Sequence, residues 1–349
     1  MSKAPLSRIT PSRKKQHVDI ILSKDVAFKH KTTGLEKWEF VNNALPELDL
    51  SEIDTSTVFL KRRLSLPLMI SCMTGGYAEA LRINRSLAEI CEEKCIAMGV
   101  GSQRQALETS TYHRTFSIAR EAAPSIPIVG NIGAAEVASM TSSIQVRRLA
   151  KLIGADAFAV HLNPLQEFLQ PEGNANFKGV LKGIATLVRE LPIPVIVKEI
   201  GGGISARVAQ MLIDVGVRYI DVAGAGGTSW AGVEMLRRKE GSLTHEFWDW
   251  GIPTATALRE VVALSRRGRR LRIIASGGIN SGLDAAKCLA LGADLIASAR
   301  PMLKALHDGG KKGLKALIEN WALELRGTMF LTGSCDLRTL RHATLVRYR

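Results

Sequence analysis

The chain has 349 residues, of which 46% are hydrophobic and 23% charged, as is ordinary for a globular protein of one large or two small domains. No apolar run approaches the roughly 20 residues that a membrane helix needs, and the basic N-terminus lacks the apolar segment of a secretory signal. Five cysteines without CxxC spacing favour a reducing, cytoplasmic setting.

The formal net charge of +14 has three explanations, which are nucleic-acid binding, phosphate-bearing small ligands, or a solvated face. Basic residues fall in separate clusters at 8–15, 61–63, 266–272 and 338–349, not along one stripe. Aromatic residues make up only 5% of the chain, which leaves few stacking surfaces for single strands. We therefore expect a phosphorylated small molecule as partner, and neither nucleic acid nor membrane.

The first 65 residues show no strong hydrophobic period. The stretch from Arg13 to Leu22 suits an amphipathic helix, and loops with short extended pieces follow it. We expect residues 1–65 to form an N-terminal extension that contributes substrate-binding residues and has no core of its own.

From residue 66 onward, short apolar runs alternate with helix-like stretches. The runs are Leu66–Cys72, Ile96–Val100, Ile126–Gly130, Ala155–Val160, Pro194–Val197, Tyr219–Val222, Ile273–Ala275 and Leu295–Ala297. Helix-like stretches between them include Ala80–Cys95, Ala135–Ile153, Ala206–Val215 and Leu283–Leu291. This alternation is typical of parallel sheets. It predicts an α/β fold, a (β/α)₈ TIM barrel over residues 66–335, followed by a basic tail, 336–349. No GxGxxG follows the first run, which argues against a dinucleotide fold.

The richest polar stretch follows the fourth run. His161 and Asn163 lie two apart and so share one face of a strand, and Gln166 and Glu167 follow within one turn. Such groups are costly to bury in a core but not at the mouth of a site. A polar loop with a satisfied histidine is the alternative. Because every other run also ends in polar or glycine residues, and barrel sites lie at these strand ends, a site is favoured.

Lys198 ends a strand that is as apolar as any in the chain. It can be explained as a structural lysine paired with Asp221 or Glu199. It can also be a fixed cation beside an electron-rich ring, because flavin barrels place a lysine where the reduced ring gathers negative charge. Asn131 and Thr74 are then candidates for hydrogen bonds to the same ring.

Two strand ends suggest a phosphate site. Gly277-Gly278-Ile279 follows the seventh run and precedes a helix that Ser281 is expected to cap, with Asp284 three residues on. Ser298-Ala299 follows the eighth run. An ordinary turn also uses paired glycines, but loops after strands seven and eight are the usual phosphate site of a barrel.

In this order, the motifs resemble the type 2 isopentenyl diphosphate isomerases, which are FMN-dependent (β/α)₈ barrels. The matching pieces are Arg13-Lys14-x-x-His17, Met73-Thr74-Gly75-Gly76, Gly101-Ser102-x-Arg104, Gly130-Asn131, His161-x-Asn163-x-x-Gln166-Glu167, Gln170-Pro171-Glu172-Gly173, Val197-Lys198-Glu199, Gly226-Gly227-Thr228-Ser229-Trp230 and Gly277-Gly278-Ile279. The family interconverts isopentenyl and dimethylallyl diphosphate and needs reduced FMN, Mg²⁺ and a reductant such as NADPH.

The resemblance implies a role for each matching residue. Gln166 would lie over the reacting carbons, with His161 and Asn163 beside it, and Glu167 would bind Mg²⁺. The substrate diphosphate would be held by Arg13, Lys14, Ser102, Gln103 and Arg104. FMN would be held by Cys72, Met73, Thr74, Ser102, Asn131, Lys198, Thr228, Gly277, Gly278, Ile279, Ser298 and Ala299. Asn280 departs from the longer polar or basic residue of many relatives, which leaves open how the FMN phosphate charge is offset. A homo-oligomer, tetramer or octamer, is implied too.

The implied chemistry moves a double bond by adding a proton at C4 and removing one at C2, with the reduced flavin supplying the proton and stabilising the cation. The rival interpretation is an FMN-dependent 2-hydroxy-acid oxidase, which resembles a pattern with His-Gly-Ala-Arg after the sixth strand. Here that place has residues 223–227, Ala-Gly-Ala-Gly-Gly, with no base. An inosinate-type dehydrogenase would want a cysteine there, and none is present. A nucleic-acid-binding protein would instead use the net charge.

Overall fold

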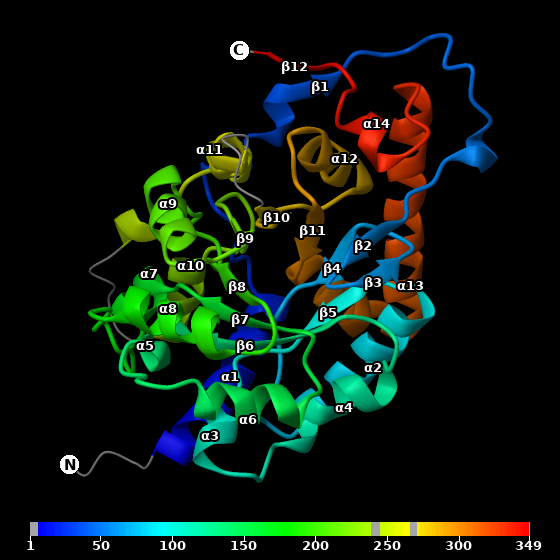
Figure 1. Ribbon diagram of the computed structural model, residues 1–349. Helices are drawn as coiled ribbons and strands as arrows, with labels where there is room; N and C mark the ends of the chain where they lie inside the picture. The colour runs from blue at the N-terminus through cyan, green and yellow to red at the C-terminus, as the bar shows by residue number, and fades with distance from the viewer. Residues whose placement is uncertain (1–5, 239–244, 266–270, 349) are drawn as a thin grey trace.

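The computed structural model describes residues 6–238, 245–265 and 271–348, so most of the basic cluster at 266–272 lies outside the described residues. Parallel strands form a closed barrel in chain order, and β11 pairs back to β4 (Figure 1). The barrel strands are β4 (Leu68–Ile70), β5 (Ala97–Gly99), β6 (Ile128–Gly133), β7 (Ala157–His161), β8 (Val195–Lys198), β9 (Tyr219–Asp221), β10 (Arg272–Ala275) and β11 (Leu295–Ser298). Each overlaps one predicted run, which confirms the (β/α)₈ barrel.

Helices surround the barrel on its outer face (Figure 1). They are α2 (Ala80–Glu93), α4 (Arg114–Ala122), α6 (Ile144–Leu152), α8 (Val180–Glu190), α9 (Ala206–Asp214), α11 (Thr254–Ser265), α12 (Gly282–Ala290) and α13 (Arg300–Leu331). Shorter helices lie in the connections, namely η1 (Leu35–Lys37), η2 (Leu50–Glu52), α3 (Arg104–Glu108), α5 (Ala134–Val137), α7 (Pro164–Leu169), α10 (Trp230–Arg237) and η3 (His245–Phe247).

The prediction of a single helix over Ala135–Ile153 is wrong, because the stretch is divided into α5 and α6. Thr141, Ser142 and Ser143 lie at the break, and their short hydroxyl side chains compete with the helical backbone hydrogen bonds. Ser143 also donates its backbone N–H to Glu190 of α8, at 2.9 Å, which holds the break in place.

Two layers of apolar side chains flank the barrel strands. The outer layer joins the strands to the helices, and the inner layer fills the barrel. A hairpin of β2 (Thr57–Phe59) and β3 (Arg62–Leu64) contributes the buried Phe59 and Leu64 to the inner layer. The hairpin therefore closes the N-terminal end of the barrel and leaves the opposite end for a site.

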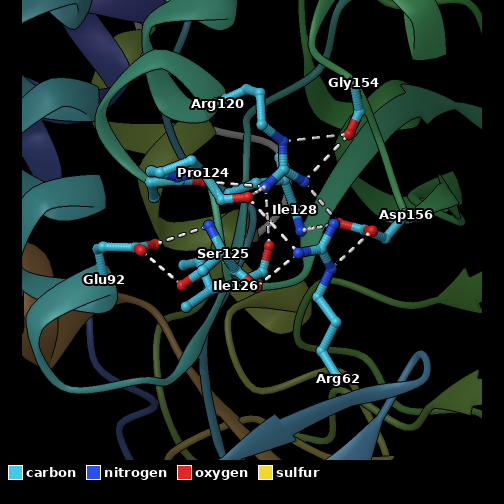
Figure 2. A network of polar contacts seen from close by, with 10 residues as sticks. Arg62, Glu92, Arg120, Pro124, Ser125, Ile126, Ile128, Gly154 and Asp156 are labelled. Atoms are coloured by element: carbon cyan, nitrogen blue, oxygen red, sulfur yellow. Dashed lines mark hydrogen bonds and ion pairs between the residues drawn. The ribbon is translucent and has the colours of Figure 1, made fainter.

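A polar network surrounds this closed end (Figure 2). Arg62 of the hairpin and Arg120 of α4 both bind the carboxylate of Asp156, at 3.0 and 2.6 Å. The same carboxylate accepts the backbone N–H of Ile128, the first residue of β6, at 2.9 Å. The network thus ties the hairpin, one outer helix and two strand starts together.

The N-terminal extension reaches the open end. Helix α1 (Leu6–Ser23) begins before the predicted Arg13 and packs against α3, α10 and α13. The next residues follow the loop after β9, where Phe28 donates its backbone N–H to Gly227 and Ser229 donates to Val26. The extension therefore forms part of the mouth of the barrel.

The C-terminal segment lies against the same chain. It contains α14 (Leu337–Leu340) and β12 (Leu345–Arg347), and β12 pairs antiparallel with β1 (Trp38–Phe40) of the extension. Among the described residues, no helix is both long and apolar enough to cross a membrane.

Candidate active site

Two adjoining cavities lie at the C-terminal ends of the strands. Their volumes are about 470 and 130 Å³, and we call them the larger and the smaller cavity. Residues that line both are Lys14, His17, Cys72, Met73, Lys198, Ile200 and Trp230. This shared wall is the junction between the cavities.

Glycine loops after β9 and β10 form one side of the larger cavity. Gly226, Gly277 and Gly278 have φ of 118°, 100° and 70°, a region that side chains rarely adopt. A Cβ on Gly227 would overlap the backbone of Gly278, so the two loops can approach only as glycines. Ser281 caps α12 by accepting the Asp284 N–H at 3.0 Å, as predicted. Backbone N–H groups and a helix N-terminus thus lie at this wall, which suits a phosphate.

The larger cavity is positively charged. None of its described lining residues is acidic, and Arg300 and Lys304 line it besides Lys14 and Lys198. Arg300 donates to the carbonyls of Ile21 and Lys24 at 3.2 and 3.3 Å, which connects it to α1. Arg300 directly follows Ser298 and Ala299 at the end of the eighth strand, and this position was the signal in the sequence that could have identified it.

Lys198 is paired, as the first of its sequence-based explanations expects, and it also lies at the cavities. Its Nζ lies 3.6 Å from Asp221 Oδ2 and donates to the Glu199 carbonyl at 2.5 Å, so it is a paired lysine. It also lines both cavities. Asp221 accepts from Ser276 Oγ at 2.6 Å through its other oxygen, which fixes the carboxylate. Lys198 is therefore a held cation at the junction.

The smaller cavity gathers the polar stretch of the fourth strand. Asn163 donates its Nδ2 to Gln166 Oε1 at 3.2 Å and to Glu167 Oε1 at 3.0 Å. His161 Nδ1 lies 3.0 Å from Asn131 Oδ1. Burial, with Lys198 and Lys14 nearby, lowers the pKa of His161 to about 3, so its imidazole is neutral at pH 7.

Three cations from two elements line the other side of the smaller cavity. Lys14 of α1 donates to the carbonyls of Gly75 and Ser102 at 2.8 and 2.5 Å. Burial and the charge of Arg13 lower the pKa of Lys14 to about 7. The buried Nε of Arg13 has no hydrogen-bond partner in the described part of the chain. Arg104 pairs with Glu136 at 2.9 Å. We call Arg13, Lys14 and Arg104 the cation group.

Glu167 lines the smaller cavity together with the cation group, and its charge acts on Arg13. Its second oxygen accepts the Asn174 N–H at 2.6 Å, which steadies the carboxylate. Within the described ranges, no three histidine, cysteine or acidic side chains gather as a complete metal site. A single carboxylate still fits Mg²⁺, because this ion commonly takes one or two carboxylates and completes its shell with phosphate oxygens and water.

Two predicted residues line neither cavity. Thr74 donates its hydroxyl to Asn84 Oδ1. Gln103 donates to the Leu149 carbonyl at 3.0 Å and accepts the Asn131 N–H at 3.2 Å, so it holds Asn131 in place. The other predicted site residues line one or both cavities, namely Arg13, Lys14, Cys72, Met73, Ser102, Arg104, Asn131, His161, Asn163, Gln166, Glu167, Lys198, Thr228, Gly277, Gly278, Ile279, Ser298 and Ala299.

Sequence reasoning missed a buried ionic group behind Gln166. Glu234 of α10, whose side chain is 0% exposed, contacts His17 at 2.9 Å, Arg237 at 2.6 Å and Gln166 at 3.1 Å. Burial raises the pKa of Glu234, but the polar contact with His17 and the charges of His17 and Arg237 outweigh this and hold the pKa below its usual value. The available signal was one glutamate inside the otherwise apolar stretch of α10.

Known proteins match this chain over most of its length. A family named FMN-dependent dehydrogenase matches residues 133–347. A protein of Chlorobaculum parvum (strain DSM 263 / NCIMB 8327) named isopentenyl-diphosphate delta-isomerase is 49% identical, over 97% of this chain and 98% of its own. One of the same name from Pseudescherichia vulneris is 46% identical, over 96% of each chain.

A solved structure of mandelate oxidase with (S)-2-phenylpropionate has a TM-score of 0.67 at 18% identity, covering 99% of each chain, and at this identity it shows the shared fold alone. The relatives that match over nearly the full chain show the family, which the solved structure does not. The chain belongs to the isopentenyl-diphosphate delta-isomerase family on an FMN-dependent dehydrogenase barrel, which confirms the resemblance found in its motifs.

Proposed function

We propose that this protein interconverts isopentenyl and dimethylallyl diphosphate by proton addition and elimination, using reduced FMN and Mg²⁺. The observation that carries the proposal is the junction between the two cavities. A large cavity with a phosphate-type wall meets a smaller one that is lined by the cation group, by Lys198 and by the two acidic residues Glu136 and Glu167. NADPH as reductant, a cytoplasmic location and a homo-oligomeric assembly belong to the same proposal.

The residues of the larger cavity fit FMN. The glycine loops, Ser298 and the start of α12 would hold its phosphate, and Arg300 would offset the charge that Asn280 cannot. Lys198 and Asn131 would lie beside the ring. When bound and reduced, FMN supplies a transferable proton and an electron-rich surface next to the developing carbocation.

The smaller cavity fits the diphosphate end of the substrate. The cation group and the Ser102 hydroxyl would bind its oxygens, and Glu167 would bind Mg²⁺ that bridges to them. Binding at this remote end would fix the alkene at the junction, where a near-attack geometry removes much of the entropic barrier.

No strong acid lies at the junction or beside it. At the junction, the pKa of Lys14 is about 7 and burial raises the pKa of the Cys72 thiol to about 12, and His161 in the smaller cavity is neutral at pH 7. An unactivated alkene needs a stronger proton donor than these groups offer. The side chains would therefore bind, orient and exclude water, and Gln166, which lines the smaller cavity, would contact the reacting carbons.

The rival oxidase activity needs a base and a cation after the sixth barrel strand, which is β9. There the larger cavity is lined by Ala223, Gly224, Gly226 and Gly227, which have no titratable side chain. Oxidation of a 2-hydroxy acid would lack both its proton acceptor and its carboxylate-binding group.

The test uses purified holoenzyme under anaerobic conditions. With oxidised FMN, isopentenyl diphosphate should stay unchanged, and addition of dithionite or NADPH should start conversion. In deuterated water the new methyl group of the product should gain label, because a proton enters at C4. Absence of bound flavin after reconstitution with FMN, or equal activity with oxidised flavin, would contradict the proposal.

A further inference from the structure

The amide of Gln166 is held at both ends inside the protein. Its Nε2 donates to Glu234 Oε1 at 3.1 Å, and its Oε1 accepts from Asn163 at 3.2 Å. Asn163 donates in turn to Glu167 at 3.0 Å. The result is a row of hydrogen-bonded side chains that runs from α10 to α7. Its groups are, in order, the carboxylate of Glu234, the amides of Gln166 and Asn163, and the carboxylate of Glu167.

The two carboxylates determine the direction of every hydrogen bond in this row. An ionised carboxylate accepts and never donates, whereas an amide has one donating and one accepting end. Glu234 must therefore face the nitrogen of Gln166. This leaves the Gln166 oxygen toward Asn163, whose own nitrogen is directed to Gln166 and Glu167. The buried Asn163 Oδ1 accordingly has no donor in the described part of the chain.

Glu234 is itself held by Arg237 and contacted by His17. Arg237 binds its Oε2 at 2.6 Å and also contacts Glu172 at 3.1 Å, which keeps the buried charge of Glu234 compensated. His17 of α1 approaches Oε1, the oxygen that binds Gln166, at 2.9 Å. The His17 ring packs edge-on against Trp230, with centroids 5.3 Å apart. His17 therefore contacts Glu234 only while α1 is docked.

We propose that Glu234 is a positioning residue, which fixes the Gln166 amide with its nitrogen toward α10 and its oxygen toward Asn163 and links that orientation through His17 to α1. Since α1 also carries Arg13 and Lys14, the helix that contacts the diphosphate is the one that completes the orientation of Gln166. This inference rests on the isomerase function proposed above. Glu234 lines neither cavity, so its effect must pass through its partners.

The first test is Glu234→Gln, which keeps the shape but can present either end to Gln166. We expect kcat to fall about 10²-fold, as for a misplaced reacting group, while KM and bound FMN stay near their wild-type values. Glu260→Gln is the matched control, because Glu260 is a half-buried carboxylate that accepts the Ala206 N–H at 3.0 Å away from Gln166. Its kcat should be unchanged.

A double-mutant cycle separates positioning from direct participation. If Glu234 acts through Gln166, then Glu234→Gln should have no further effect on kcat in a Gln166→Ala background. An equal loss in both backgrounds, or a loss of FMN or of substrate affinity in place of kcat, would overturn the proposal. A wild-type enzyme without isomerase activity would instead overturn the proposed function, before any variant is made.

Two substitutions of His17 test whether its contact with Glu234 connects α1 to the orientation of Gln166. They remain informative even if the Glu234 variants fail to fold. His17→Phe keeps a ring against Trp230 but removes the N–H, and His17→Gln restores an N–H near the position of Nε2. We expect kcat to fall in His17→Phe and to recover in large part in His17→Gln. Equal kcat in His17→Phe and wild type would show that α1 does not influence Gln166.

Discussion

The two ends of the barrel differ in whether their polar groups are paired within the protein. At the closed end, the Asp156 network pairs its charges directly. Arg120 donates to Asp156 at 2.6 Å and to the carbonyls of Ala123 and Ile126 at 2.9 and 3.0 Å, and Arg62 adds a second pair at 3.0 Å (Figure 2). The bonds of Asp156 to Arg62, Arg120 and Ile128 connect separate chain segments. The arrangement contributes to stability and has no group left for a ligand.

At the open end, several buried polar atoms form no hydrogen bond in the described part of the chain. Arg13 Nε, His17 Nε2, Tyr77 Oη, Asn163 Oδ1 and Gln170 Nε2 all belong to residues that line a cavity, and of these His17 Nε2 has a polar contact instead, with Glu234 at 2.9 Å. Leaving such an atom unpaired costs about 1–3 kcal/mol. The Asp156 network thus pairs its polar atoms within the protein, whereas several polar atoms of cavity residues have no partner in the described part of the chain.

The largest effect on activity is expected from Glu167→Gln at the open end. The variant should retain FMN but lose activity by about 10²-fold or more, because it removes the carboxylate assigned to Mg²⁺ and hence its electrostatic support. Activity is measured against Mg²⁺ concentration, and flavin content by absorbance. Activity near wild type at limiting Mg²⁺ would place the metal elsewhere, with Glu172 the next candidate.

Asp156→Asn should have the opposite effect: it should lower the free energy of unfolding and leave kcat unchanged. Replacing the shared carboxylate weakens charged hydrogen bonds to Arg62 and Arg120, which are worth about 1.5–3 kcal/mol each in typical cases. Chemical denaturation should report a lower free energy of unfolding, while kcat per folded, flavin-loaded chain stays constant. A fall in kcat at unchanged stability would mean that the two ends are not independent.

Binding of diphosphate should weaken as pH rises through about 7. The pKa of Lys14 is lowered to about 7, so the free protein loses this cation above that pH, and an anion binds the protonated form better. Calorimetry with inorganic pyrophosphate should show proton uptake on binding near pH 7 to 8. Lys14→Arg keeps its charge and should flatten the dependence. A pH-independent affinity in the wild type would contradict the assignment of Lys14.

The smallest effect concerns Cys72. Burial raises the pKa of its thiol to about 12, so almost no reactive thiolate exists at neutral pH. Iodoacetamide at pH 7.5 should label the exposed Cys95 and Cys335 first, and peptide mass spectrometry should find Cys72 unmodified at the same time. Rapid labelling of Cys72 in the holoenzyme would show that the junction is open to water and that the thiol is ionised.

The barrel was predictable from sequence because its strands are short apolar runs that alternate with helix-like stretches. Most cavity residues were also predictable, since they directly follow these runs. Contacts between residues far apart in the chain could not be predicted from the sequence. His17 and Glu234 lie more than two hundred positions apart and meet only when α1 docks on α10. The same limit explains Thr74, which follows the first strand but donates to Asn84 of α2, away from both cavities.

We propose that the open end uses flavin chemistry without net redox. The most direct test measures how many product molecules form for each NADPH oxidised. Holoenzyme reduced once with a limiting amount of NADPH is given excess isopentenyl diphosphate in the absence of oxygen, and product is measured against NADPH oxidised. The account predicts many product molecules for each NADPH consumed, until the two isomers reach equilibrium. One NADPH consumed for each product would contradict it and identify the protein as a dehydrogenase.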